Sequence, residues 1–294
     1  MILVISAKSS VPIGTDRMRL GRRPDTHEGP IPGHVMRSRP LQQRAAAPAL
    51  PPLPPPGTLA RSVRLLRLFR LEQTDPDVFY SSLAEDAVNQ VARYADIADQ
   101  TVLDIGGGAG HFTAAFRARG ANCYLFEPDR GELLSRGEVP AGAILANGYW
   151  LPAADGTADI CFSSNVLEHV ADPVGLLEEM IRATRPGGLI YLSFTNWYSP
   201  WGGHEMSPWH LLGARFAERR YRRRYGRPPK HIVGENLFRQ HVGPTLRLLR
   251  TRRDVTLVEA LPRYYPWWCK AVVRVPLVRE FATWNLLLVL RRTT

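Results

Sequence analysis

Residues 104–110, where glycines follow an acid, are the part of this sequence best suited to binding chemistry. The stretch has the sequence Asp-Ile-Gly-Gly-Gly-Ala-Gly, so Gly106, Gly108 and Gly110 alternate after Asp104. Glycine lets the backbone adopt dihedrals that a β-carbon forbids and approach a ligand closely. Apolar residues before the stretch predict a strand, and the residues after it predict a helix whose first turn adds backbone donors. The stretch therefore predicts a ligand-binding turn.

Two details of this turn favour a ligand other than a dinucleotide. The dinucleotide fingerprint needs Gly or Ala three residues after its second glycine, and that position holds His111. The carboxylate of Asp104 would repel a pyrophosphate, whereas it suits a ligand that carries an ammonium group. Glu127 ends the next predicted strand, where an acid can accept both hydroxyls of a ribose. The alternative for Glu127 is a solvated turn residue.

Alternating apolar and amphipathic segments predict the scaffold that positions these residues. The expected helices are 111–119, a short one after 130, and 172–185; the expected strands are 101–105, 122–126, 143–146, 159–163, 189–194, 255–260 and 285–290. Such alternation is typical of a parallel sheet covered on both faces, which binds ligands beyond the carboxyl ends of its strands. We therefore expect an α/β, Rossmann-like, doubly wound fold with a seven-stranded sheet.

The first part of the chain differs in composition. Residues 1–58 are rich in Pro and Arg, and we expect a disordered tail because proline removes amide donors and fixes φ. Residues 59–98 predict an N-terminal helical cap, with helices over 61–71 and 75–94. The first helix has Arg at every third position beside an apolar stripe. This pattern fits a helix packed on the domain with its arginines in water, or a helix on an anionic membrane surface.

Charge and cysteine content set broader bounds. The net charge is +11, but only three of the 38 basic residues are lysines, a bias that indicates a GC-rich genome more than selection for nucleic acid. Cys123 and Cys161 lie in predicted strands and are expected to be buried free thiols, and the cysteines lack metal-ligand spacing, so we expect no metal. No apolar run approaches ~20 residues. We expect a cytoplasmic protein, with peripheral contact at the inner membrane face left open.

The chain from about residue 99 resembles the class I S-adenosylmethionine (SAM)-dependent methyltransferases of the type 11 group. The resemblance is carried by 102–110, Glu127, 151–152 with 158–160, 165–170 and 185–188. Flanking segments at 201–206 and 276–281 resemble uncharacterised actinobacterial methyltransferases. This resemblance implies a mostly parallel sheet with the last strand antiparallel, SAM as cofactor, and a SAM-binding domain over 99–294 with an acceptor-side insertion at 196–253.

The resemblance also implies roles for individual residues along the SAM molecule. Asp104 and the three glycines would hold its amino-acid part, and Glu127 its ribose. The position that usually carries an aspartate facing the adenine holds Asn147, followed by Gly148. Asparagine keeps a carbonyl acceptor for the adenine amino group, and Ser164 and Asn165 are expected beneath the methionine end.

The acceptor side is less constrained by the sequence. Candidate catalytic residues are His169, after the fourth strand, and His204 and Glu205 in the insertion; the alternative is a local structural cluster. We expect O-methylation of a small molecule or of a lipid or glycolipid. Three other functions stay open: a non-catalytic SAM-binding scaffold or regulator, a nucleotide-dependent oxidoreductase, which His111 opposes, and an RNA methyltransferase that uses the basic segment 219–225. We do not expect nucleic acid to be the partner, because a charge run is usually a solvated helix face.

Overall fold

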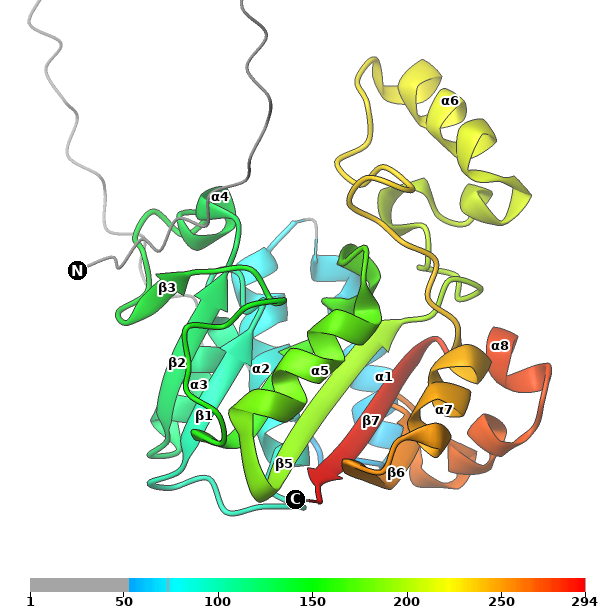
Figure 1. Ribbon diagram of the computed structural model, residues 1–294. Coiled ribbons are helices and arrows are strands. Elements are labelled where there is room, and N and C mark those ends of the chain that lie inside the picture. The colour runs from blue at the N-terminus through cyan, green and yellow to red at the C-terminus, as the bar shows by residue number, and fades with distance from the viewer. Residues whose placement is uncertain (1–52, 73, 294) are drawn as a thin grey trace, which may run out of the picture. The chain divides into compact units, whose positions relative to one another are not determined.

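A seven-stranded sheet in the order β3-β2-β1-β4-β5-β7-β6 forms the centre of the computed structural model, which describes residues 53–72 and 74–293 (Figure 1). The strands are β1 (Thr101–Ile105), β2 (Asn122–Glu127), β3 (Ala143–Leu145), β4 (Ala158–Ser164), β5 (Thr184–Thr195), β6 (Val255–Pro262) and β7 (Asn285–Arg292). Neighbours from β3 to β5 pair in parallel, whereas β7 runs antiparallel to both β5 and β6. The predicted topology, with its antiparallel last strand, is confirmed. Most of the predicted 1–58 tail lies outside the described residues.

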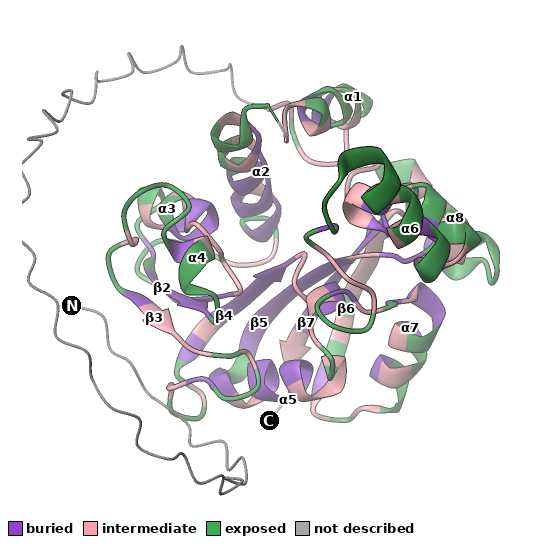
Figure 2. Ribbon diagram, turned by 90° about the horizontal axis from the view of Figure 1, so that it is seen from above, coloured by how far each residue is buried: buried purple, intermediate pink, exposed green. Residues whose placement is uncertain are grey.

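Helices cover both faces of the sheet, as the alternation predicted. The helices are α1 (Leu59–Leu68), α2 (Pro76–Val91), α3 (His111–Ala118), α4 (Arg130–Leu133), α5 (Pro173–Ala183), α6 (Ala214–Tyr225), α7 (Val242–Thr251) and α8 (Val278–Ala282). Short 3-10 helices are η1 (Phe69–Leu71), η2 (Leu167–His169), η3 (His204–Met206), η4 (Trp209–Leu212) and η5 (Trp267–Arg274). Seen from above, the central strands β4, β5 and β7 are mostly buried, whereas the edge strands β3 and β6 are only partly buried (Figure 2).

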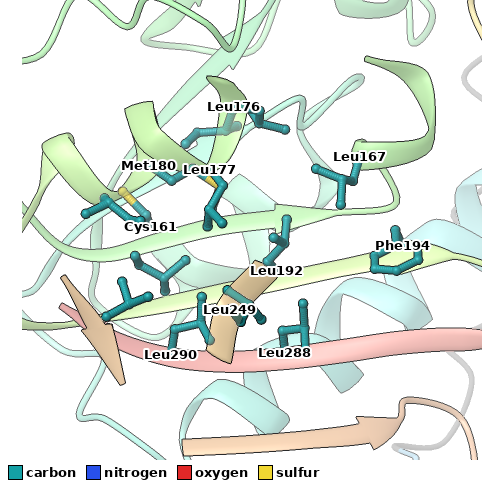
Figure 3. Packing of buried hydrophobic residues seen from close by; sticks show 14 of the residues in the cluster. Cys161, Leu167, Leu176, Leu177, Met180, Leu192, Phe194, Leu249, Leu288 and Leu290 are labelled. Atoms are coloured by element: carbon teal, nitrogen blue, oxygen red, sulfur yellow. The ribbon is translucent and has the colours of Figure 1, made fainter. Parts of the chain in front are cut away.

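Two apolar layers hold the sheet between its helices. On one face, Leu177 of α5 and Leu249 of α7 pack with Leu192 of β5 and Leu288 of β7 (Figure 3). A second cluster on the cap side joins residues of α1, α2 and α3 to the same strands. Residues 189–192 of β5 and 286–290 of β7 are apolar and buried on both faces, which fits a doubly covered sheet. Cys123 and Cys161 are buried free thiols, as expected.

The expected arrangement of the first cap helix needs one correction. Arg61 of α1 is fully buried rather than in water, whereas Arg67 and Arg70 are exposed. Nε and Nη2 of Arg61 donate to the two carboxylate oxygens of Asp86 in α2, each at 2.6 Å, and Nη1 donates to the carbonyl of Arg263 at 3.0 Å. The guanidinium is buried because a buried acid on the next helix pairs with it, and the pair fastens the cap to the end of β6.

The segment expected as an acceptor-side insertion, 196–253, divides into two parts. Its last helix, α7, belongs to the main core through Val242, Leu246 and Leu249. The preceding part has a small cluster of its own, built from Trp197, Met206, Ala217 and Leu237. It extends beyond the carboxyl end of β5, where α6 lies away from the sheet (Figure 1). Among the described residues, no helix has the length and apolar character to cross a membrane.

Candidate functional site

The glycine turn between β1 and α3 has the positive φ angles that its glycines allow. The φ angles of Gly106, Gly108 and Gly110 are 72°, 53° and 80°, a region that side chains disfavour. A β-carbon at Gly106 would lie 2.5 Å from Cγ2 of Val166, so a larger residue has no room there. A β-carbon at Gly108 would meet no atom within 4 Å. The turn therefore presents its backbone to open space at Gly108, where a ligand can lie.

Asp104 ends β1 with its carboxylate almost wholly buried, 1% exposed. Its Oδ2 accepts a hydrogen bond of 2.7 Å from the hydroxyl of Thr113, and its Oδ1 is buried with no partner among the described residues. Burial raises the pKa of Asp104 to about 7, against the opposing hydrogen bond from Thr113. An unpaired buried carboxylate oxygen favours a ligand with a positively charged donor, such as the ammonium group of SAM.

Glu127 ends β2 and is also buried, 6% exposed, so it is not a solvated turn residue. Its Oε2 accepts from the backbone N–H of Gly108 and its Oε1 from that of Asp129, both at 3.0 Å. Burial raises the pKa of Glu127, while these two bonds lower it. The carboxylate is therefore fixed against the glycine turn, in the position where the resemblance places the ribose.

Glu127→Ala is expected to weaken SAM binding by ~1–3 kcal/mol, because it removes the ribose acceptor and strands the Gly108 N–H. Titration calorimetry measures this change. Glu138→Ala, which removes an exposed acid, is the control and leaves the affinity unchanged. An unchanged affinity in Glu127→Ala would show that the ribose lies elsewhere.

The other candidate cofactor residues lie at the same edge of the sheet, and each has a different hydrogen-bond partner. Asn147 and Gly148 follow β3, and Oδ1 of Asn147 accepts from the backbone N–H of Tyr149 at 3.1 Å. Ser164 ends β4, and its hydroxyl accepts a hydrogen bond of 2.7 Å from Nη1 of Arg263. Asn165 follows it with a φ of 58°, and its Oδ1 accepts from Asn285 at 2.8 Å. The two residues expected beneath the methionine end are thus held by a buried polar network.

Three histidines meet on the acceptor side of this edge. The predicted residues His169, in η2, and His204, in η3, lie with ring centroids 4.8 Å apart. His231, from the segment between α6 and α7, lies 5.0 Å from the first ring and 4.5 Å from the second. Sequence reasoning did not find His231, since its neighbours in the sequence carry no pattern that marks it.

The electrostatics of this cluster distinguish two of the three candidate catalytic residues, His204 and Glu205. Burial lowers the pKa of His204 to about 3, so its imidazole is neutral at physiological pH. Burial opposes the ionisation of Glu205, but bonds from the Nδ1 and backbone N–H of His231, at 2.7 and 2.9 Å, lower its pKa to about 2. Glu205 is therefore an ionised partner of His231 and a poor proton acceptor. His210 is buried and bonds the carbonyl of Trp197 at 2.9 Å, which orders the insertion.

Two cap residues, Glu72 and Tyr80, interact with the histidine cluster and with the helix after the glycine turn, respectively. The hydroxyl of Tyr80 donates to Glu72 at 3.2 Å, and its ring stacks on His111 at the start of α3 with centroids 5.7 Å apart. Burial raises the pKa of Glu72, and among the nearby charges His231 lowers it and Glu205 raises it. The charges of His231 and Glu205 thus act on the pKa of Glu72 in the cap, and the ring of Tyr80 contacts the helix that begins at the turn.

A protein-family model and several known proteins are similar to this chain, and all of them are methyltransferases. A family model described as a methyltransferase domain matches residues 103–192. The chain is 49% identical over 246 residues to an uncharacterized methyltransferase of Mycolicibacterium gilvum, covering 80% of this chain and 96% of that one. A counterpart from Mycobacterium marinum is 46% identical, covering 79% and 94%.

Two solved structures are similar at lower sequence identity. One is an S-adenosylmethionine dependent methyltransferase from Mesorhizobium loti, with a TM-score of 0.47 and 18% identity, covering 71% of this chain and 98% of that one. The other is geranyl diphosphate methyltransferase in complex with SAM, with a TM-score of 0.45 and 17% identity, covering 81% and 92%.

Proposed function

This chain belongs to the SAM-dependent methyltransferases, and we propose that it methylates an oxygen of a lipid or glycolipid acceptor at an anionic membrane surface. The residues at the carboxyl edge of the sheet fit SAM: Oδ1 of Asp104 is buried without a partner, Gly108 faces open space, and Glu127 is fixed beside it. SAM supplies the methyl group and its own leaving group. The chain has to position the acceptor and exclude water.

The grouping of imidazoles on the acceptor side supports oxygen as the methylated atom. A hydroxyl is a weak nucleophile until it loses its proton, so the transfer needs a group that accepts or displaces that proton. His169 follows β4 and His204 follows β5, so both lie beyond the carboxyl ends of these strands, at the edge that carries the candidate cofactor residues. A hydroxyl acceptor therefore matches the chemistry that this side offers.

A surface that we call the η5 face carries the proposal for a lipid acceptor. Its large apolar side chains are all exposed: Leu59, Val63, Leu66, Trp267, Trp268, Leu277 and Phe281. The exposed fraction reaches 68% for Trp267 and 77% for Leu277. The backbone N–H of Trp267 donates to the carbonyl of Gly57 at 2.8 Å, which joins η5 to the segment that begins α1. Exposed basic residues on α1 and η5 are Arg67, Lys270 and Arg274, and Arg70 lies in η1 directly after α1.

This combination is what membrane interfaces use. Large aromatic and aliphatic side chains enter the headgroup region, while neighbouring Arg and Lys attract anionic lipids. Leu59, Val63 and Leu66 have helical spacing and so share one side of α1. Large exposed apolar side chains on adjoining elements of a globular domain often mark a binding site. The η5 face thus supports the membrane alternative that the pattern over 61–71 had left open.

A basic groove along α6 supports an acceptor with an anionic headgroup. The groove has a volume of about 1170 Å³ and is lined by Arg215, Arg219, Arg220, Arg223, Arg224 and Arg239. The guanidinium of Arg220 lies 4.0 Å from the ring centroid of Trp209. Arginine pairs well with phosphate and sulfate oxygens. The arginines of α6 therefore suit a charged headgroup, while the η5 face suits an apolar body.

Flotation with vesicles tests the membrane proposal. The full chain is expected to float with vesicles that contain an anionic lipid at low salt, and less at high salt, because salt screens the basic residues. The variant Trp267→Ser/Trp268→Ser is expected to lose most of the floating fraction. Leu134→Ser, which removes an exposed leucine outside the η5 face, is the matched control and floats like the parent chain.

Failure to float at low salt would contradict the proposal. Displacement from the vesicles by RNA at equal phosphate concentration would favour the RNA methyltransferase alternative, since that competition would assign the arginines of α6 to nucleic acid.

A further inference from the structure

The geometry points to a metal site, and we propose that His169, His204 and His231 bind one divalent transition-metal ion of the zinc class. One ring nitrogen from each histidine can serve as a ligand, and these three atoms lie within 4.8 Å of one another. The histidines come from η2, from η3 and from the segment that precedes α7, so only the tertiary structure brings them together. The expectation of no metal, which rested on cysteine spacing, did not consider this combination.

Hydrogen bonds select the ring nitrogens that are left to bind a metal. Nδ1 of His169 lies 2.8 Å from the carbonyl oxygen of Asn236, and a carbonyl can only accept, so this Nδ1 carries the proton. Nδ1 of His231 lies 2.7 Å from Oε2 of Glu205 and donates to that carboxylate. In a neutral imidazole the other nitrogen then carries a lone pair. Both rings therefore present an Nε2 acceptor, the form that a metal ligand requires.

The third histidine has a polar atom that needs a partner. Nε2 of His204 is buried and has no hydrogen-bond partner among the described residues. A buried polar atom left unpaired costs about 1–3 kcal/mol, so native structures seldom keep one without reason. A bond to a metal would give this nitrogen a partner. The same ion could then bind the Nε2 lone pairs of His169 and His231.

Neighbouring residues fix the orientation of the histidine rings by hydrogen bonds, as they do around bound metals. Metal-binding histidines nearly always donate their second N–H to a carboxylate or a backbone carbonyl, and Glu205 and Asn236 supply one of each. Asn236 is itself fixed, because its Oδ1 accepts from the N–H of Ile232 at 2.7 Å and its Nδ2 donates to the carbonyl of Lys230 at 3.0 Å. These bonds brace the segment that carries His231.

The donor set indicates the kind of ion. Three neutral imidazoles suit Zn²⁺ and its neighbours in the first transition row, whereas Mg²⁺ and Ca²⁺ prefer oxygen ligands. A tetrahedral zinc with bonds of about 2.0–2.1 Å places its ligand atoms about 3.3 Å apart, so modest side-chain rotations from the present separations close the site. Three protein ligands leave a fourth position for water or a hydroxyl, as in catalytic zinc sites.

The role of the ion rests on the proposed function. A hydroxyl of the acceptor that takes the fourth position loses its proton more readily, because the cation stabilises the alkoxide. The O–H bond breaks and the proton leaves to water. The oxygen then uses an electron pair to bond the methyl carbon, while the pair of the broken carbon–sulfur bond goes to sulfur. The products are a methyl ether and S-adenosylhomocysteine.

Metal analysis of the full chain tests the site independently of activity. The chain expressed with Zn²⁺ and desalted is expected to hold one equivalent by elemental mass spectrometry. Chain stripped with a chelator and titrated with Co²⁺ is expected to develop visible absorption that saturates at one equivalent. His169→Ala, His204→Ala and His231→Ala are each expected to lose the ion, whereas the control His241→Ala keeps it. Glu205→Gln is expected to bind it about 10–100-fold more weakly.

A further readout keeps the test decisive where a histidine variant fails to fold. Zn²⁺ is expected to raise the melting temperature of the stripped parent chain, since it binds only the folded form. A parent chain with no retained metal, no Co²⁺ absorption and no thermal shift would overturn the proposal, as would three folded variants that all keep the ion. Bound metal in a chain that methylates no lipid would support the site and contradict only the proposed function.

Discussion

Gly106→Ala is expected to weaken SAM binding roughly 100-fold, from strain of about 1–2 kcal/mol in the left-handed backbone and an overpacking cost of similar or larger size. The φ of Gly106 is 72°, and a β-carbon there would lie 2.5 Å and 2.8 Å from the two γ-carbons of Val166. Val166 lies in the turn that follows β4. The clash is therefore relieved only if this turn or the glycine turn shifts, and both form part of the site. The turn would have to shift and would no longer present Gly108 to the cofactor. Titration calorimetry of the variant with SAM measures the loss.

Gly187→Ala is the matched control for this prediction. Gly187 has a φ of 74°, close to that of Gly106, but its added β-carbon would meet nothing within 4 Å. It lies toward the amino end of β5, away from the ligand edge. This variant therefore carries the same backbone strain without the clash, and its affinity for SAM is expected to equal that of the parent chain. Equal affinities in Gly106→Ala and the parent would mean that the turn does not hold the cofactor.

Arg61→Met is expected to lower the free energy of unfolding by about 3–5 kcal/mol, the usual cost of leaving one buried charge unpaired. Arg61 is fully buried and Asp86 is 1% exposed, and the two form a bidentate pair. The substitution leaves the carboxylate of Asp86 without its counterion inside the cap. Denaturant unfolding of the full chain measures the change.

Two further variants separate the buried pair from the general effect of removing an arginine. Arg61→Met/Asp86→Leu is expected to recover most of the lost stability, because replacing both partners of a buried pair with apolar residues is often nearly neutral. The carbonyl of Arg263 keeps a donor in this variant from Gln90, at 3.3 Å. Arg67→Met, at an exposed position of the same helix, is expected to change stability by less than about 0.5 kcal/mol. If Arg61→Met were as stable as Arg61→Met/Asp86→Leu, the charge-pair explanation would be refuted.

The arrangement of the candidate cofactor residues was predictable because they are close in sequence and tied to local backbone geometry. Asp104 and the glycines occupy one turn whose spacing excludes a dinucleotide loop, and Glu127 ends the adjacent strand. Parallel pairing of β1 with β2 then places them together without any long-range choice. The alternation of apolar and amphipathic segments predicted the strands in the same way, including the short β3, whereas the antiparallel last strand was implied by the resemblance.

The acceptor half was only partly predictable, since it depends on packing between distant segments. His169 and His204 were found as polar residues near the expected edge, but His231 lies in a loop with no periodic pattern. Its place beside them follows from how the insertion folds beyond the carboxyl end of β5. Arg61 was misplaced for a similar reason. The helical pattern over 61–71 shows a basic stripe, and it cannot show that one member faces a buried acid on α2.

The most direct test of this account is titration calorimetry of the full chain with SAM, S-adenosylhomocysteine and NAD. The turn at Asp104, the open space at Gly108 and the buried carboxylate of Glu127 predict that both SAM species bind at one site per chain and that NAD does not. Binding of NAD with no binding of either SAM species would contradict the account.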